Sequence, residues 1–140
     1  MMGAYTHNLD QKNRLAIPAK IRAELGDSFV LTVSPSGEQC LLAYTFDGWD
    51  SVMARINDQP SSEDLMLTQR FIYMHSDKID LDSQGRMTIP AAFMQEAGFR
   101  KEVHILGVGE RVEFWDPEIF RRMQERNREI MQSKKIFFSL

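Results

Sequence analysis

One short motif occurs twice in this chain, and the duplication limits the possible folds more than any other feature. Residues 9–18 read LDQKNRLAIP, and 72 residues later residues 81–90 read LDSQGRMTIP. At that spacing, eight of the eighteen positions in residues 9–26 are identical to their counterparts in residues 81–98. The chain of 140 residues therefore consists of two related halves, each built on the same strand–turn–strand–helix unit.

Each copy begins with residues that favour a tight turn. Asp10 and Asp82 can accept hydrogen bonds from backbone amides two or more residues later, as in an Asx turn. Three positions after each aspartate stand Asn13 and Gly85, the residue types that best tolerate a positive φ. We expect each turn to close a hairpin whose short return strand ends before a proline. The return strands are predicted at residues 14–17 and 86–89.

The residues after each motif predict the same series of elements in both halves. A short helix should end at Gly26 or Gly98, because glycine favours the left-handed conformation after a helix C-terminus. Two β-rich segments and a longer helix come next, with Asp47 and Asp116 as the expected N-caps. The short helices are expected at residues 18–25 and 90–97, and the strands at residues 28–33, 39–46, 101–108 and 111–115.

This series predicts an α+β fold, because two strands precede each helix and the pattern does not alternate as in a parallel-sheet enzyme. A polar linker and a helix over residues 65–75 separate the two halves. We expect a first repeat with its helix in residues 1–56, the linker and connecting helix in 57–76, and a second repeat with a C-terminal helix in 77–140.

Composition and charge exclude several classes of function. The single cysteine, Cys40, rules out an internal disulfide and a multi-cysteine zinc site. Because the sequence contains neither a catalytic constellation nor a metal-ligand spacing, we predict no enzyme, no cofactor, no metal and no small-molecule substrate. No secretory signal or membrane-spanning run is evident, so we expect a cytoplasmic protein without a membrane partner. With a net charge of −3, nucleic-acid binding requires a local basic face.

The two copies differ in charge. The first copy, residues 10–26, has four basic and two acidic residues and a net charge of +2. The second copy, residues 82–98, has one basic and two acidic residues and a net charge of −1. Contacts with phosphate are therefore expected mainly from the first copy. Near the second copy, Arg100 and Lys101 are expected to restore part of the missing charge.

These residues resemble the MraZ family of bacterial transcriptional regulators. The resemblance covers nearly the whole chain and includes both Asp-x-x-x-Arg motifs and three flanking segments. The flanking segments are YTFDGW at 44–49, EVHILGVG at 102–109 and VEFW at 112–115. The resemblance implies a duplicated swapped-hairpin β-barrel unit of the AbrB group, with flanking helices. It also implies DNA binding through the two motif loops and a ring-shaped homo-oligomer. Its expected targets are repeated promoter elements of the division and cell-wall gene cluster.

The predicted site lies in the two motif loops. Arginine presents a planar fork of donors that can bind phosphate or the O6 and N7 atoms of guanine. The alternative interpretation is that each arginine only pairs with the aspartate of its own turn. The predicted DNA-binding residues are Arg14, Arg86, Lys12, Asn13 and Gln84, and the residues that structure the turns are Asp10, Asp82 and Gly85. Lys20 and Arg22 are either phosphate contacts or the solvated face of a short helix.

We therefore expect a sequence-specific, DNA-binding transcriptional regulator associated with the bacterial nucleoid. Its partners would be double-stranded DNA with direct repeats and further copies of itself. The alternative is a protein-interaction module, similar to an antitoxin on the same fold, in which DNA binding is secondary. The apolar positions of the last helix favour packing either on its own domain or on a neighbouring subunit, and the sequence leaves both possibilities open.

Overall fold

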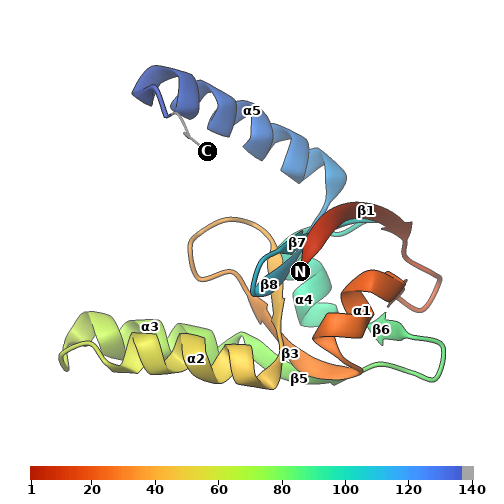
Figure 1. The fold of residues 1–140 in the computed structure, drawn as a ribbon, viewed down its shortest axis with the longest axis horizontal. Helices are drawn as coiled ribbons and strands as arrows, with labels where there is room; N and C mark the ends of the chain where they lie inside the picture. Colours follow the sequence, from red (N-terminus) through yellow and green to blue (C-terminus); the bar gives the residue numbers. More distant parts are fainter. Residues whose placement is uncertain (137–140) are drawn as a thin grey trace.

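The computed structural model describes residues 1–136, within which eight strands and five helices follow one another (Figure 1). The first half contains β1 (Met2–Asn8), β2 (Arg14–Ala16), α1 (Ala19–Leu25), β3 (Ser28–Val33), β4 (Leu41–Tyr44) and α2 (Phe46–Asn57). After α3 (Glu63–Met74), the second half contains β5 (Ser76–Asp80), β6 (Arg86–Thr88), α4 (Ala91–Ala97), β7 (Glu102–Val108), β8 (Arg111–Trp115) and α5 (Pro117–Lys134). The predicted α+β class and the twice-repeated order are confirmed. Residues 137–140 of the predicted second half lie outside the described residues.

The two halves exchange strands. Six strands form one sheet in the order β1-β7-β8-β4-β3-β5, and all of its neighbouring strands are antiparallel. The first strand of each half pairs with the third strand of the other half, as β1 does with β7 and β5 with β3. If each strand is replaced by its counterpart in the other half, the same strand order is read from the opposite edge of the sheet. The sheet therefore has an approximate twofold axis.

The prediction that each motif turn closes a hairpin is wrong. The strands before and after the first turn do not pair with each other, because β1 pairs with β7 whereas β2 pairs with β6 in a separate two-stranded sheet. In the small sheet Leu15 lies opposite Met87, and both side chains are fully buried. Burying these side chains between the halves stabilises the exchanged pairing, which the local turn sequence does not specify.

Alternating residues of the large sheet face two separate apolar cores. On β4, Leu41 and Ala43 belong to the main core, which also contains residues of β2, β6, α1 and α4. Leu42 and Tyr44 face the opposite side and pack in a second core around Trp115. This alternation follows from the period of two along a strand, and it places the helices of the two halves on both faces of the sheet.

Two helix starts differ from the expected positions. The N-cap of α2 is Thr45 rather than Asp47, because Thr45 Oγ1 accepts a hydrogen bond from the Gly48 amide at 3.0 Å. Asp47 instead lies in the first turn, where a negative charge is favourable next to the helix N-terminus. The connecting helix α3 begins at Glu63 after Ser62, whose side chain accepts from the Leu65 amide. Asp116 caps α5 as predicted.

Two helical arms leave the sheet on the side away from the β2–β6 sheet (Figure 1). One arm consists of α2 and α3, and the other is α5. None of the residues of α5 is fully buried, although Ile119, Phe120 and Met123 pack on the second core. Among the helices within residues 1–136, none has both the length and the apolar character needed to cross a bilayer.

Candidate nucleic-acid interface

The first signature loop, residues 10–14, is folded around the carboxylate of Asp10. Its Oδ1 accepts hydrogen bonds from the amides of Lys12 and Arg14, both at 2.9 Å, and its Oδ2 accepts from Arg14 Nε at 2.6 Å. The amide of Asn13 donates to the Asp10 carbonyl at 3.1 Å, and Asn13 has a φ of 57°. A single side chain thus orders both the loop backbone and the arginine that follows it.

The second signature loop, residues 82–86, repeats this geometry. Asp82 Oδ1 accepts from the amides of Gln84 and Arg86, both at 2.9 Å, and Oδ2 accepts from Arg86 Nε at 2.8 Å. The Gly85 amide donates to the Asp82 carbonyl at 3.0 Å, and Gly85 has a φ of 75°. The two loops therefore have the same internal hydrogen bonds.

These hydrogen bonds favour the charged forms of both aspartates. Donation by the Arg14 amide is the largest cause that lowers the pKa of Asp10 from its ordinary 3.8 to about 2, and the Arg14 side chain and the Lys12 amide add to it. The corresponding hydrogen bond from the Arg86 amide lowers the pKa of Asp82. Both carboxylates are consequently ionised at neutral pH, and each holds the Nε of its arginine.

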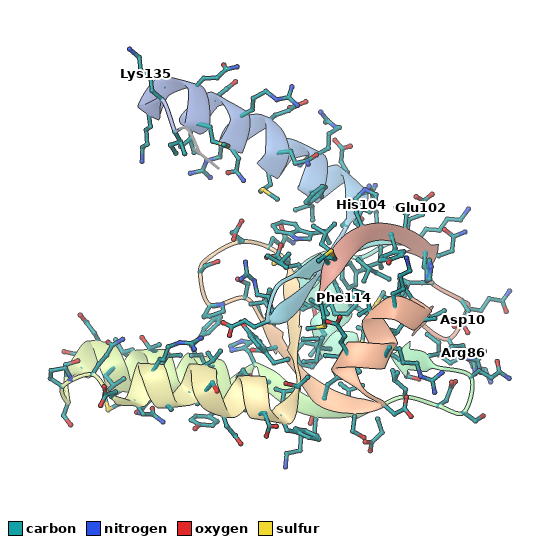
Figure 2. The ribbon with its side chains drawn as sticks, viewed as in Figure 1. Asp10, Arg86, Glu102, His104, Phe114 and Lys135 are labelled. Atoms are coloured by element: carbon teal, nitrogen blue, oxygen red, sulfur yellow. The ribbon has the colours of Figure 1, made fainter. Side chains whose placement is uncertain are left out.

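The strand exchange brings the two loops together at the end of the molecule opposite α5, where Figure 2 labels Asp10 and Arg86 close to each other. Arg86 Nη1 lies 3.9 Å from Asp10 Oδ2. Reciprocal backbone hydrogen bonds also join the loops to the opposite strands, from the Ile17 amide to the Gly85 carbonyl at 3.0 Å and from the Ile89 amide to the Asn13 carbonyl at 2.9 Å. The loops thus form one bipartite surface.

The predicted binding residues are accessible to different extents. Lys12, Asn13, Gln84 and Lys20 are exposed, and the side chains of Arg14 and Arg86 keep 29% and 26% of their accessible surface. In each arginine, Nε is held by an aspartate, which leaves the terminal nitrogens for a further acceptor. This arrangement can present two oriented guanidinium groups, together with one lysine and two amide side chains, to one ligand surface.

Arg22, which follows the first loop in the sequence, lies next to the second loop. Its Nε donates to Asp27 Oδ1 at 2.7 Å, and this hydrogen bond is the main cause that raises the pKa of Arg22. A Cβ placed on Gly85 would lie only 2.5 Å from Arg22 Nη1. Gly85 is buried here, whereas its counterpart Asn13 is exposed.

The structure also relocates the basic residues that follow the second copy. Arg100 and Lys101 were expected to restore part of the charge near the second copy, residues 82–98, and this stays a prediction. The Leu9 amide donates to the Lys101 carbonyl at 2.8 Å, next to the first loop, because β7 pairs with β1. Arg100 Nε lies 3.7 Å from Asp116 at the start of α5. The backbone of Lys101 thus lies beside the first loop, and the Arg100 side chain lies beside Asp116.

Sequence reasoning missed Asp27 as part of the site. A signal for it was present, because Arg22 and Asp27 lie five residues apart in the first half, whereas the second half has Met94 and Phe99 at the positions that correspond by the repeat spacing. The contact between the loops was also missed, since it depends on strand pairing across the two halves.

The chain matches known proteins over most of its length. A family model described as "MraZ protein, putative antitoxin-like" matches it over residues 1–70 and again over 72–136. The chain belongs to the MraZ family. It is 38% identical over 121 residues to the Transcriptional regulator MraZ of Thermoanaerobacter pseudethanolicus, covering 86% of this chain and 83% of that protein. The Transcriptional regulator MraZ of Acetivibrio thermocellus is 37% identical over 115 residues, with coverage of 81% and 79%.

Membership in the MraZ family indicates a regulator rather than an enzyme. The relatives are named as transcriptional regulators, and the family is one of regulators rather than enzymes. The two matches of the family model fall on the two halves of the chain, so each half contains one signature loop.

Proposed function

We propose that this protein is a sequence-specific, DNA-binding transcriptional regulator that contacts DNA through both signature loops. The observation that carries the proposal is the pair of loops at one end of the molecule, each with an arginine oriented by its own aspartate. Orientation of the guanidinium reduces the side-chain entropy lost on binding, and it favours two-pronged recognition of a guanine edge or a phosphate.

The remaining loop residues supply contacts of a different kind. Exposed Lys12 is suited to a phosphate, because ammonium groups act as point charges toward the DNA backbone. Asn13 and Gln84 carry amide groups that can donate to and accept from base edges. Lys20 and Arg22 remain candidates for phosphate contacts on the first short helix. Local charge is required here because the whole chain carries a net charge of −3.

The finer assignments follow from the family resemblance and are part of the proposal. The exchanged strands support a swapped-hairpin unit in each half, with the halves in residues 1–56 and 77–140 and a linker with its helix in 57–76. The DNA targets are direct repeats in promoters of the division and cell-wall gene cluster. The protein would act in the bacterial cytoplasm, in association with the nucleoid.

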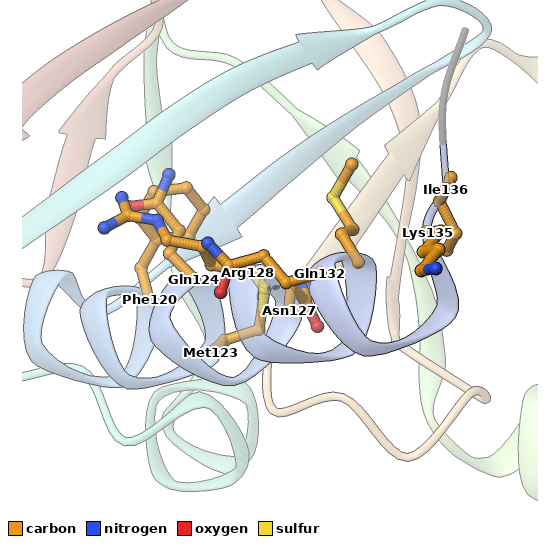
Figure 3. A pocket seen from close by; sticks show the side chains of 9 residues that line it. Phe120, Met123, Gln124, Asn127, Arg128, Gln132, Lys135 and Ile136 are labelled. Atoms are coloured by element: carbon orange, nitrogen blue, oxygen red, sulfur yellow. Dashed lines mark hydrogen bonds between the residues drawn. The ribbon is translucent and has the colours of Figure 1, made fainter.

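Self-association into a ring is the second part of the proposal, and the two helical arms support it. An open groove of about 660 Å³ follows α5, where Phe120 and Met123 line one end and Ile136 the other (Figure 3). The helix itself carries five basic and three acidic residues, a net charge of +2. The arm of α2 and α3, residues 46–74, carries five acidic and two basic residues, a net charge of −3.

Both arms also expose apolar side chains, including Leu67 and Met74 on α3 and Met131 on α5. We therefore assign the occupant of the α5 groove as the α2–α3 arm of a second copy. Such contact joins two different surfaces and repeats from head to tail, which closes a ring when the rotation permits. A ring would present several pairs of loops to repeated DNA sites and increase affinity through effective concentration.

The signature arginines provide the direct test. Arg14→Ala and Arg86→Ala should each lower affinity for promoter DNA by about 10- to 100-fold, as expected for loss of a bidentate base contact, while the protein stays folded. Arg100→Ala is the matched control, because it removes the same charge from an exposed side chain outside both loops and both arms. Binding curves at moderate salt would contradict the proposal if both signature variants matched the wild type. That result would favour the protein-interaction alternative.

Oligomeric state and operator design test the second part. Light scattering should show a species larger than a dimer, and affinity should fall steeply when one DNA repeat is deleted. Moving two repeats apart by half a helical turn should have a similar effect, since the loops would then face different sides of the duplex. A monomer that binds one repeat as tightly as several would exclude the ring.

A further inference from the structure

Two residues of the first half hold the second signature loop at both of its ends. Arg22 Nε donates to Asp27 Oδ1 at 2.7 Å, and the guanidinium of Arg22 covers Gly85 near the C-terminal end of the loop. The Asp27 carbonyl accepts from the amide of Leu81 at 2.8 Å, directly before the loop. The loop backbone is thus held by a side chain at one end and by a hydrogen-bonded strand at the other.

The first loop has no equivalent of this pair. The repeat spacing places Met94 at the position that corresponds to Arg22, and Met94 packs on the main core. Strand pairing places Lys101 at the position of Asp27, because its carbonyl accepts from the amide before the first loop. The turn residue Asn13 is consequently exposed.

The residue type at each turn agrees with this difference. At Gly85 a Cβ would lie 2.5 Å from Arg22 Nη1, so a side chain there must displace the guanidinium. At the corresponding position of the first loop, Asn13 has nearly the same backbone conformation, with a φ of 57° against 75°. Both residues tolerate positive φ. The need for glycine in the second loop therefore comes from the presence of Arg22.

We propose that Arg22 and Asp27 form a brace that positions the second signature loop. Arg22 then acts through Gln84 and Arg86, as a positioning residue, instead of as an independent phosphate contact. Its planar guanidinium can lie flat on the glycine backbone while Nε stays bonded to Asp27, and lysine cannot reproduce this geometry. The consequence for DNA affinity rests on the proposed function, whereas the consequence for loop conformation does not.

Amide hydrogen exchange in the DNA-free protein tests the brace directly. Arg22→Met installs the residue of the corresponding position in the second half. We expect exchange at the amides of Gln84 and Gly85 to accelerate several-fold, on the order of the coupling between residues in contact. The amides of Asn13 and Arg14 should not change and serve as an internal reference. The control variant is Arg100→Ala, which removes one charge from an exposed side chain outside both signature loops.

Two further variants separate the brace from a phosphate contact. Arg22→Lys keeps the charge but loses the planar fork, so the brace predicts faster loop exchange and about tenfold weaker DNA binding. If Arg22 were instead a phosphate contact, Arg22→Lys would retain the wild-type loop exchange and the wild-type DNA affinity. Gly85→Asn should displace the guanidinium and reproduce the effects of Arg22→Met. The double variant, Arg22→Met with Gly85→Asn, should then lose no more loop protection and DNA affinity than either single variant.

The loop exchange rates decide the outcome whether or not DNA binds. Unchanged exchange in both Arg22→Met and Arg22→Lys would overturn the brace, as would fully additive losses in the combination with Gly85→Asn. If Arg22→Met fails to fold, Arg22→Lys and Gly85→Asn give the same decision. Absence of DNA binding by the wild-type protein would contradict the proposed function alone.

Discussion

The two signature loops have the same internal hydrogen bonds, but their surroundings differ. The first loop is exposed at Asn13, and its aspartate lies near two arginines, Arg14 and Arg86. The second loop is covered at Gly85 by Arg22. The comparison teaches that the hydrogen bonds that order each loop lie within five residues, whereas the partner half determines which side chains cover the loop and which charges surround it.

The largest change should come from removing a buried side chain between the two halves. Leu15→Ala at the centre of the β2–β6 pair should lower the free energy of unfolding by about 2–5 kcal/mol, because a fully buried leucine leaves a cavity opposite Met87. Denaturant unfolding measures this loss, and the exposed neighbour Ala16→Ser should change it by less than about 0.5 kcal/mol. A loss equal to that of the control would mean that this contact contributes little to the stability of the fold.

Acid should affect the two loops unequally. The pKa of Asp10 is about 2 in the folded protein, below its ordinary 3.8, so Asp10 stabilises the fold above pH 3.8 and this contribution disappears as the pH falls through about 2. Asp10→Asn should lower Tm at neutral pH, and it should reduce the decrease in Tm as the pH falls from 3.8 to about 2. Asp82→Asn should act in the same direction but less, because Asp10 also lies 3.9 Å from Arg86. Thermal unfolding over pH 2–7 would refute this order if the two variants behaved alike.

Changes at Lys12 and Gln84, which directly precede the turn residues of the two loops, should alter the salt dependence of DNA binding. Lys12→Gln should reduce the slope of log K against log salt by roughly 0.9, because one phosphate contact is lost. Gln84→Lys should increase the slope by up to a similar amount if the second loop approaches the DNA as closely as the first. Titrations at several salt concentrations measure both slopes, with Gln84→Asn as the neutral control. An unchanged slope for Lys12→Gln would assign this lysine to the solvated surface.

The smallest effect is expected at the exposed turn position. Asn13→Gly gives the first loop the turn residue of the second, and it should change the free energy of unfolding by no more than about 0.5 kcal/mol. Glycine accepts the φ of 57°, and no covering side chain is displaced because Asn13 is exposed. A calorimetric change above about 1 kcal/mol would show that the side chain of Asn13 stabilises its loop in the folded state.

The order of elements and most of their positions could be predicted from the sequence, because periodicity and helix caps act over a few residues. Asp116 caps α5 as its sequence indicates, yet the N-cap of α2 is Thr45 instead of Asp47, because the Thr45 hydroxyl accepts a hydrogen bond from the Gly48 amide. Strand partners could not be predicted, since β1 and β2 are adjacent in sequence and still belong to different sheets. Their pairing depends on apolar surface buried between the halves, which no short segment encodes.

The sequence by itself determined the conformation of each signature loop, because the aspartate, the turn residue and the arginine interact within five residues through short hydrogen bonds. Only the tertiary structure decided which loop each neighbouring residue serves. Arg22 follows the first loop in the chain but covers the second, and Lys101 follows the second but lies beside the first. The reason is physical: the first strand of each half pairs with the third strand of the other, so the segments after one loop lie beside its counterpart.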